Sequence, residues 1–249
     1  RKKSASPLEL WGRHRYGSGL SCSQVIPMHA LRRFLDTSVG RKTVLAITGM
    51  SLFGFVVVHL LGNFTLFSGT EALNEYADKL EALGPVLIVA EVGLLVLFVV
   101  HMGLALSLNR QSREARPEGY RLRANMGNST TASRSMLITG LVLGVFLVIH
   151  IADFRIKKIM GNPDVADLGQ AVVDRITSPI GLVIYLGGII ALGLHLRHAL
   201  QSAFQTFGLS HPRWTQNVRC ASVAIATLIT LGFLSIPLYL LFIGQGAAS

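Results

Sequence analysis

The sequence contains few charged side chains and only two cysteines. Charged residues make up 14% of its 249 residues, whereas hydrophobic residues make up 51%. A soluble domain of this size carries far more charge, so the composition excludes an ordinary water-soluble fold and indicates an integral membrane protein. Cys22 and Cys220 lie far apart and form no Cys-x-x-Cys pair. The chain alone can therefore build neither an iron–sulfur cluster nor a disulfide framework.

Acidic residues are also scarce, 13 against 23 basic ones, and the net charge is +10. Residues 1–43, 109–135 and 197–219 carry 9, 6 and 3 of the basic residues, against 5 in the other loops. Loops rich in basic residues thus alternate with loops poor in them, and apolar runs separate the two kinds. This pattern indicates membrane topology and not nucleic-acid binding. Because basic loops stay in the cytoplasm, we predict a cytoplasmic amino terminus and, after five spans, an external carboxyl terminus.

Five apolar runs are long enough to cross a bilayer. We predict transmembrane helices at about 44–67, 85–108, 136–160, 180–207 and 218–243. The first run begins only near residue 44 and is long enough to span, so no cleavable signal peptide is expected. Amphipathic segments at 28–43 and 69–84 predict short interfacial helices, and residues 161–178 predict a polar connection.

The predicted fold is therefore all-α. It is an integral membrane bundle of five transmembrane helices within residues 28–249, preceded by a basic extension at residues 1–27. The extension lacks a sustained apolar period, and we expect it to lie at the surface. We find no internal repeat strong enough to indicate duplication of the chain.

Four of the apolar runs each contain a histidine at a similar depth. They are His59 in VVVHLLGNF, His101 in LFVVHMGLAL, His150 in VFLVIHIADF and His195 in IIALGLHLRHAL. Successive helices run in opposite directions, so equal offsets along the chain become two heights. His59 and His150 are expected on the outer side and His101 and His195 on the inner side. With about 1.5 Å of rise per residue in a core of about 30 Å, the two layers lie roughly 14 Å apart.

We predict that these four histidines are the axial ligands to the irons of two stacked haem b groups. His59 and His150 would hold one haem, and His101 and His195 the other, because bis-imidazole ligation is one way in which helical bundles bind haem. Any one intramembrane histidine can equally be a packed or hydrogen-bonded residue. Four of them, paired by height on opposite-running helices, favour the haem interpretation.

Other polar residues are candidates for supporting roles. His198 is a rival ligand to His195 on the same helix face, or a partner for a haem propionate. Four basic residues at the inner edge could also bind propionates, although the positive-inside rule explains them equally well. These are Arg41, Lys42, Arg134 and Arg197.

Two carboxylates lie within or near the predicted spans. Glu91 falls in the outer half of the second helix, where it could handle protons or form a structural hydrogen bond. Asp153 follows His150 by one helical turn, and it could pair with Arg155 or take up protons beside the outer haem.

From SVGRKTVLAITGMSLFGFVVVHLLGN through NEYADKLEALG and EVGLLVLFVVHMGLAL to HLRHALQSAFQTFGLSHPRW, the sequence resembles the dihaem cytochrome b membrane subunit of succinate dehydrogenase and fumarate reductase. The resemblance covers about residues 38–243. In that family the first and third ligand histidines hold one haem and the second and fourth the other, and the fourth ligand opens the H-x-x-H/N stretch. The resemblance therefore favours His195 over His198.

The resemblance also implies partners and a location. It implies a respiratory complex II in a prokaryotic plasma membrane, with a flavoprotein subunit carrying FAD and an iron–sulfur subunit that docks on the basic cytoplasmic face. Electrons from succinate would then pass through the partners and the two haems to a quinone, usually menaquinone in dihaem members. Two alternatives remain: another four-histidine cytochrome without a succinate dehydrogenase partner, and a haem-free transporter. The lack of broken helices and paired half-motifs argues against the transporter.

Overall fold

The structure is a computed structural model that describes residues 28–114, 131–209, 211 and 213–242. Within these residues every regular element is helical and no strand occurs. In chain order the elements are α1 (Met28–Asp36), α2 (Ser38–Asn63), η2 (Phe64–Ser68), α3 (Thr70–Glu81), α4 (Pro85–Glu114), α5 (Thr131–Ile151), η3 (Ala152–Ile156, a π-helical segment), α6 (Lys157–Ile159), η4 (Pro163–Val165), α7 (Leu168–Thr177), α8 (Pro179–Thr206) and α9 (Thr215–Phe242). The predicted all-α class is confirmed.

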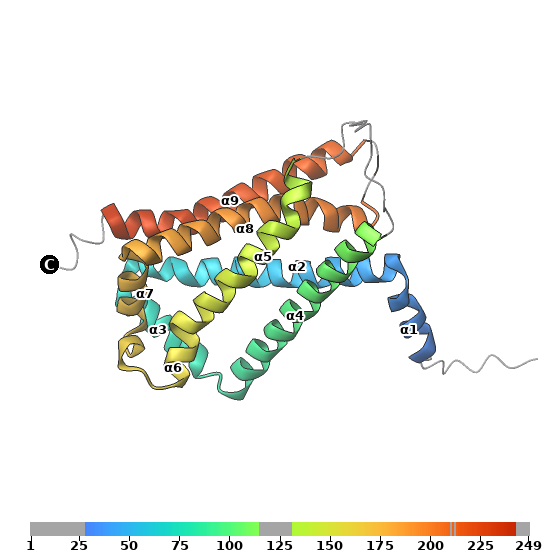
Figure 1. Ribbon diagram of the computed structural model, residues 1–249. Helices are drawn as coiled ribbons and strands as arrows, with labels where there is room; N and C mark the ends of the chain where they lie inside the picture. Colours follow the sequence, from blue (N-terminus) through green and yellow to red (C-terminus); the bar gives the residue numbers. More distant parts are fainter. Residues whose placement is uncertain (1–27, 115–130, 210, 212, 243–249) are drawn as a thin grey trace, which may run out of the picture.

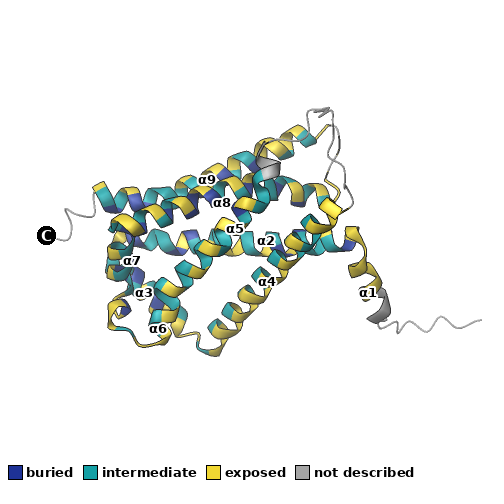
Figure 2. Ribbon diagram, in the orientation of Figure 1, coloured by how far each residue is buried: buried dark blue, intermediate teal, exposed yellow. Residues whose placement is uncertain are grey.

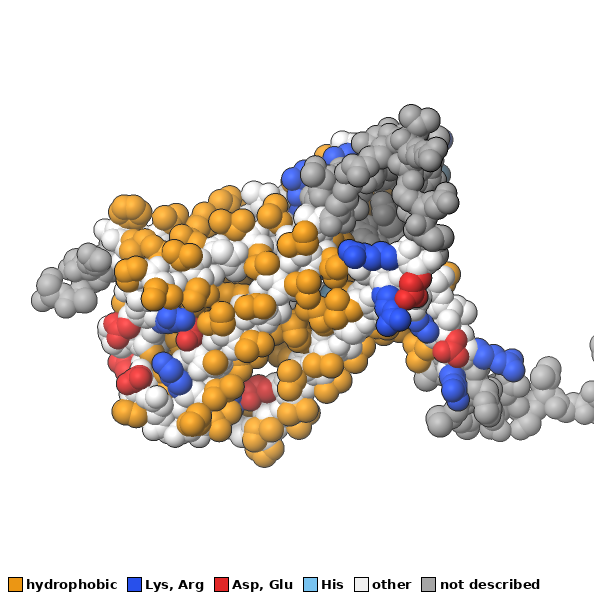
Figure 3. Space-filling model, in the orientation of Figure 1, with side chains coloured by type: hydrophobic (Ala, Val, Ile, Leu, Met, Phe, Trp, Pro, Cys, Tyr) orange, Lys and Arg blue, Asp and Glu red, His pale blue; other side chains and the backbone are white. Residues whose placement is uncertain are grey.

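Five helical stretches are long and apolar enough to cross a membrane, as predicted. They cover Ser38–Ser68, Pro85–Glu114, Ser135–Ile159, Pro179–Thr206 and Thr215–Phe242. Hydrophobic side chains cover the long side of the molecule that Figure 3 presents, whereas basic side chains gather toward the end where α1 lies. This surface is the opposite of a soluble protein's and suits a lipid environment.

The best-packed part of the bundle lies among α2, α8 and α9, which run side by side (Figure 1). Leu60 of α2, Leu196 of α8 and Ala226 of α9 all belong to its buried core. Helix α5 packs on α8, and α4 packs on α2. Helix α4 contains no buried residue, and its surface is largely exposed in Figure 2. It therefore presents most of its apolar side chains to the surroundings of the bundle.

Helices α3 and α7 pack against each other at the end of the bundle opposite α1 (Figure 1). The side chain of Asn74 on α3 donates to Asp167 Oδ1 at 2.9 Å and accepts from the backbone N–H of Gly169 at 2.8 Å. A Cβ at Gly169 would lie 2.5 Å from the backbone oxygen of Thr70, so glycine allows this close approach. These contacts join the two connections that precede α4 and α8.

The sequence predicts a polar connection over 161–178, whereas the structure has the helix α7 within this segment. Its start is fixed by Asp167, whose side chain accepts from the backbone N–H of Gln170, a standard N-cap. Its buried residues include Val172 and Ile176. Leu168 and Val173 also pack against this core, so apolar side chains recur at helical spacing along one face of α7, a signal that the prediction of a polar connection missed.

Two helix boundaries also differ from the predictions. Helix α2 begins at Ser38 and not near Val44, because the hydroxyl of Thr37 accepts from the backbone N–H of Gly40 and caps the helix there. The predicted interfacial segment 28–43 is thus divided between α1 and α2. Helix α4 extends to Glu114, beyond its apolar run, and Arg110 pairs with Glu114 in its last turn. Apolar length marks a membrane core and not a helix end.

The predicted basic extension at 1–27 lies outside the described residues, as do 115–130 in the arginine-rich loop and the carboxyl-terminal residues 243–249.

Candidate functional site

His59 on α2 and His150 on α5 lie next to each other inside the bundle. Their ring centroids are 5.7 Å apart and their planes are inclined by 82°. Aromatic rings surround them: Phe55 stacks on His59 at 5.4 Å, and Phe146 stacks on His150 at 5.8 Å. The two histidines that the sequence predicts at one height are therefore spatial neighbours.

His101 on α4 and His195 on α8 each pack onto a Thr-Gly pair of the preceding long helix. His101 Nδ1 lies 3.2 Å from Thr48 Oγ1 on α2, and His195 Nδ1 lies 3.3 Å from Thr139 Oγ1 on α5. A Cβ on the following glycine would lie 2.9 Å from His101 at Gly49 and 3.4 Å from His195 at Gly140.

The threonine hydroxyls determine which ring nitrogen carries hydrogen in this pair. Thr48 Oγ1 donates to the backbone oxygen of Val44 at 2.9 Å, and Thr139 Oγ1 donates to that of Met136 at 3.1 Å. Each hydroxyl has one hydrogen, so toward the histidine it can only accept. In this arrangement Nδ1 carries the hydrogen, and Nε2 keeps the lone pair that a metal ion would use.

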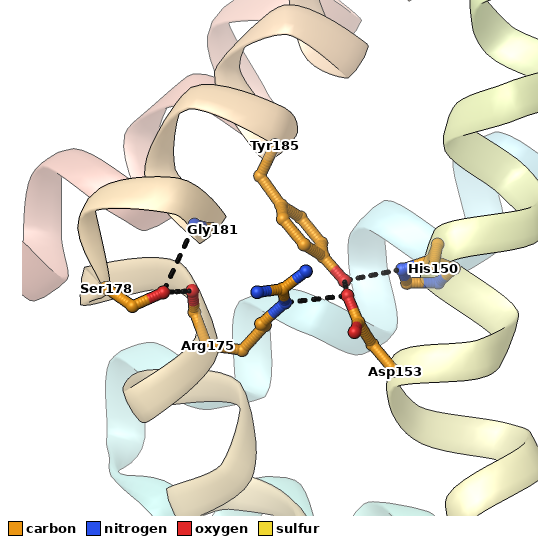
Figure 4. A network of polar contacts seen from close by, with 6 residues as sticks. All are labelled: His150, Asp153, Arg175, Ser178, Gly181 and Tyr185. Carbon is orange, nitrogen blue, oxygen red and sulfur yellow. Dashed lines mark hydrogen bonds and ion pairs between the residues drawn. The ribbon is translucent and has the colours of Figure 1, made fainter.

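Nδ1 of His150 also contacts a hydroxyl oxygen, which belongs to a tyrosine and not to a threonine. Its Nδ1 lies 3.3 Å from the hydroxyl of Tyr185 on α8, and that hydroxyl donates to Asp153 Oδ2 at 3.3 Å (Figure 4). The same carboxylate oxygen accepts from Arg175 Nε at 2.7 Å. Because the tyrosine hydrogen points to the carboxylate, the phenol oxygen accepts from His150 Nδ1–H. Nε2 of His150 is again left with its lone pair.

The contacts of these histidines reveal a short internal repeat. Ile-Thr-Gly occurs at 47–49 in α2 and at 138–140 in α5, and a histidine follows each threonine by eleven residues. The threonine of each copy contacts the histidine of the next long helix. The sequence interpretation that found no strong repeat missed this signal, which would have pointed to Thr48 and Thr139. Nothing comparable in the sequence marks Tyr185 or Arg175.

The two candidate carboxylates have arginine partners that the sequence did not assign. Glu91 on α4 accepts from Arg155 Nη2 on η3 at 2.9 Å, and about a third of each side chain is exposed. Asp153 pairs with Arg175 on α7 and not with Arg155, which corrects the suggested Asp153–Arg155 pair. Residues two positions apart on a helix do not face each other, so Arg155 is directed toward α4.

The other predicted residues differ in their surroundings. Nε2 of His198 is buried without a hydrogen-bond partner among the described residues. Arg41 Nε donates to the backbone oxygen of Leu35 at 3.0 Å, near the end of α1. Lys42 and Arg197 are exposed. Arg134 lies in the first turn of α5, and its side chain falls outside the described part of the chain.

The spacing of His59 and His150 fits the two imidazoles that a bis-histidine haem requires. Among the described residues, no group of three or more histidine, cysteine or acidic side chains could hold a metal ion. With metal–nitrogen bonds of about 2 Å, two imidazoles on one iron have centroids roughly 6 Å apart. The 5.7 Å between His59 and His150 is close to that spacing.

Comparison with known proteins identifies no relative. No family model matches the chain, and neither a curated protein nor a solved structure matches it.

Proposed function

We propose that this protein is the membrane-anchor and electron-transfer subunit of a respiratory succinate:quinone oxidoreductase. It would bind two haem b groups and deliver electrons to a quinone, with menaquinone as the proposed acceptor. The observation that carries the proposal is the state of the histidines: three of the four have Nδ1 engaged by an oxygen acceptor, which leaves Nε2 for a metal.

When bound, haem with both axial positions filled supplies one-electron transfer without binding oxygen. The residues of this chain hold and orient it. His59 and His150 would ligate one iron, and His101 and His195 the other. Thr48 and Thr139 fix the ring orientation of the second pair, while Gly49 and Gly140 leave room for those rings. Phe55 and Phe146 stack on the rings of His59 and His150 and limit their rotation.

Glu91 and Arg155 are the candidates for quinone chemistry. Quinone reduction consumes protons as well as electrons, and a carboxylate inside a span is suited to pass them on. The pair joins α4 to η3 and is partly exposed, so a lipid-soluble quinone could reach it. Arg155 would hold the carboxylate in place. Asp153 is the second proton-handling candidate, although Arg175 and Tyr185 already occupy one of its oxygens.

The basic end of the molecule suits the docking of an iron–sulfur subunit, which would in turn bind the flavoprotein subunit with its FAD. Arg32 and Arg33 on α1 and Lys42 on α2 are all exposed at this end. Clustered positive charge steers association with an acidic partner surface. By the positive-inside rule this end faces the cytoplasm.

The test is to purify the complex, count its haems by optical spectroscopy and replace each histidine by alanine. His59→Ala and His150→Ala should remove the same haem, whereas His101→Ala and His195→Ala should remove the other. His198→Ala and the exposed His211→Ala should retain both. Retention of both haems in His195→Ala, with loss in His198→Ala, would contradict the choice of the fourth ligand.

Copurifying subunits distinguish the competing functions. FAD and iron–sulfur subunits are expected with the haem protein. Haem without such subunits would instead favour a dihaem cytochrome that has no succinate dehydrogenase partner. A purified protein without haem absorbance would favour a transporter.

A further inference from the structure

One histidine of the four is connected to a charged network. His150 Nδ1 contacts Tyr185, Tyr185 contacts Asp153, and Asp153 pairs with Arg175 (Figure 4). The network joins three elements, because Asp153 lies on η3, Arg175 on α7 and Tyr185 on α8. Ser178 accepts from the backbone N–H of Gly181 at the start of α8, which holds the turn between α7 and α8 beside it.

The network is shielded from solvent. Tyr185 is buried at 7% exposure, and the side chain of Asp153 is 15% exposed. The ring of Tyr185 packs against Phe146 and Phe154, at centroid distances of 5.4 and 6.2 Å. A carboxylate in such a place acts more strongly on its neighbours than one in water, because water screens it less.

The hydrogen bonds all point from the imidazole toward the carboxylate. His150 Nδ1–H donates to the tyrosine oxygen, and the tyrosine O–H donates to Asp153. Arg175 Nε donates to the same carboxylate oxygen from the other side, at 2.7 Å. An imidazole that donates to an acceptor backed by a carboxylate becomes more electron-rich at Nε2, which makes it a stronger metal ligand.

We propose that Tyr185, Asp153 and Arg175 are positioning residues that set the reduction potential at the His59–His150 site through His150. This inference rests on the proposed function. A more basic ligand stabilises the oxidised, more positively charged iron, so the network lowers the potential. The one-electron reduction moves no proton along the network, since hydrogen stays on Nδ1. The threonine contacts of His101 and His195 lack a carboxylate at their end and leave that site outside this control.

The test is a redox titration of the purified complex carrying Tyr185→Phe, which removes the hydroxyl and keeps the ring. We expect one haem to rise in potential by about 59 mV, equivalent to a tenfold change in its one-electron equilibrium constant. The other haem should not move. Tyr239→Phe is the matched control, because Tyr239 also packs on a phenylalanine, at 5.0 Å from Phe67, and donates only to a backbone oxygen.

A second variant removes the charge and keeps the tyrosine. Asp153→Asn should raise the potential of the same haem. The double variant Asp153→Asn, Arg175→Gln should do so as well, without leaving an unpaired arginine that could prevent folding. If Tyr185→Phe loses a haem, these two variants decide the question.

The outcomes separate the two proposals. A wild-type protein without haem overturns the proposed function and this inference together. A wild-type protein with two haems whose potentials stay unchanged in all three network variants overturns the inference alone. Equal shifts of both haems, or the same shift in Tyr239→Phe, would also overturn it, because the effect would then not pass through His150.

Discussion

Thr48 on α2 accepts a hydrogen bond from His101 on α4, with 3.2 Å between Oγ1 and Nδ1. The hydroxyl hydrogen goes to the backbone oxygen of Val44, so Thr48 fixes both the orientation of the ring and the position of its hydrogen. Thr139 does the same for His195. A threonine that bonds within one helix therefore also orients a histidine on the next helix.

Thr48→Val should weaken haem binding at the site of His101 and His195 by about 10- to 100-fold, because valine keeps the shape and removes the acceptor. The measurement is haem content per protein after titration with haem. Thr43→Val is the control: Thr43 makes the same kind of backbone contact, to Val39 at 3.0 Å, but lies away from the histidines. Equal haem affinity in the two variants would contradict the assigned role.

Alanine substitutions at three glycines of the long helices should change the free energy of unfolding in different directions. A Cβ at Gly49 would lie 2.9 Å from His101, so Gly49→Ala should lower the free energy of unfolding by about 1–3 kcal/mol through overpacking. No atom lies within 4 Å of a Cβ at Gly54, so Gly54→Ala should raise it by up to about 1 kcal/mol through helix propensity. Gly140→Ala should fall between them. The unfolding temperatures of the three variants in detergent provide the measurement. A Gly49→Ala variant more stable than the wild type would contradict the prediction.

Glu91→Gln should reduce quinone-linked turnover on the order of 100-fold, because the amide cannot take up and release a proton. The haem spectra should stay unchanged, since Glu91 pairs with Arg155 and not with a histidine. Glu75→Gln is the control, because Glu75 pairs with Lys79 on the exposed surface of α3. Unchanged turnover in Glu91→Gln would remove this residue from the proton path.

Asp167 makes stability depend on pH at the α3–α7 end. The backbone N–H of Gln170, and then the side chain of Asn74, hold the pKa of Asp167 below its ordinary value of 3.8. Its contribution to stability is therefore present above that value and is lost as the pH falls through the lower pKa of the folded state. Asp167→Asn should remove this part of the acid destabilisation, whereas the exposed Asp164→Asn should retain it.

Unfolding temperatures recorded from about pH 5 down to about pH 2 provide the measurement. The difference between wild type and Asp167→Asn should shrink as the pH falls. A constant difference across this range would show that Asp167 contributes no pH dependence.

The local pattern of the sequence is sufficient to predict the five long apolar helices and which four of them contain His59, His101, His150 and His195. Both follow from apolar run length along one chain. It also marks α7, where Leu168, Val172 and Ile176 recur at helical spacing after the cap at Asp167, although the prediction took this segment for a polar connection. The start of α2 is missed because the Thr37 cap, and not hydrophobicity, decides it.

Apolar runs of bilayer length account for the five apolar helices and for the presence of a histidine in four of them. The contacts of Asp153 with Arg175 and Tyr185, and of Thr48 and Thr139 with histidines more than fifty positions away, arise only in the packed bundle. Those contacts depend on how each helix is rotated and packed against its neighbours. Rotation is set by side chains from all the helices together, which no single stretch of sequence contains.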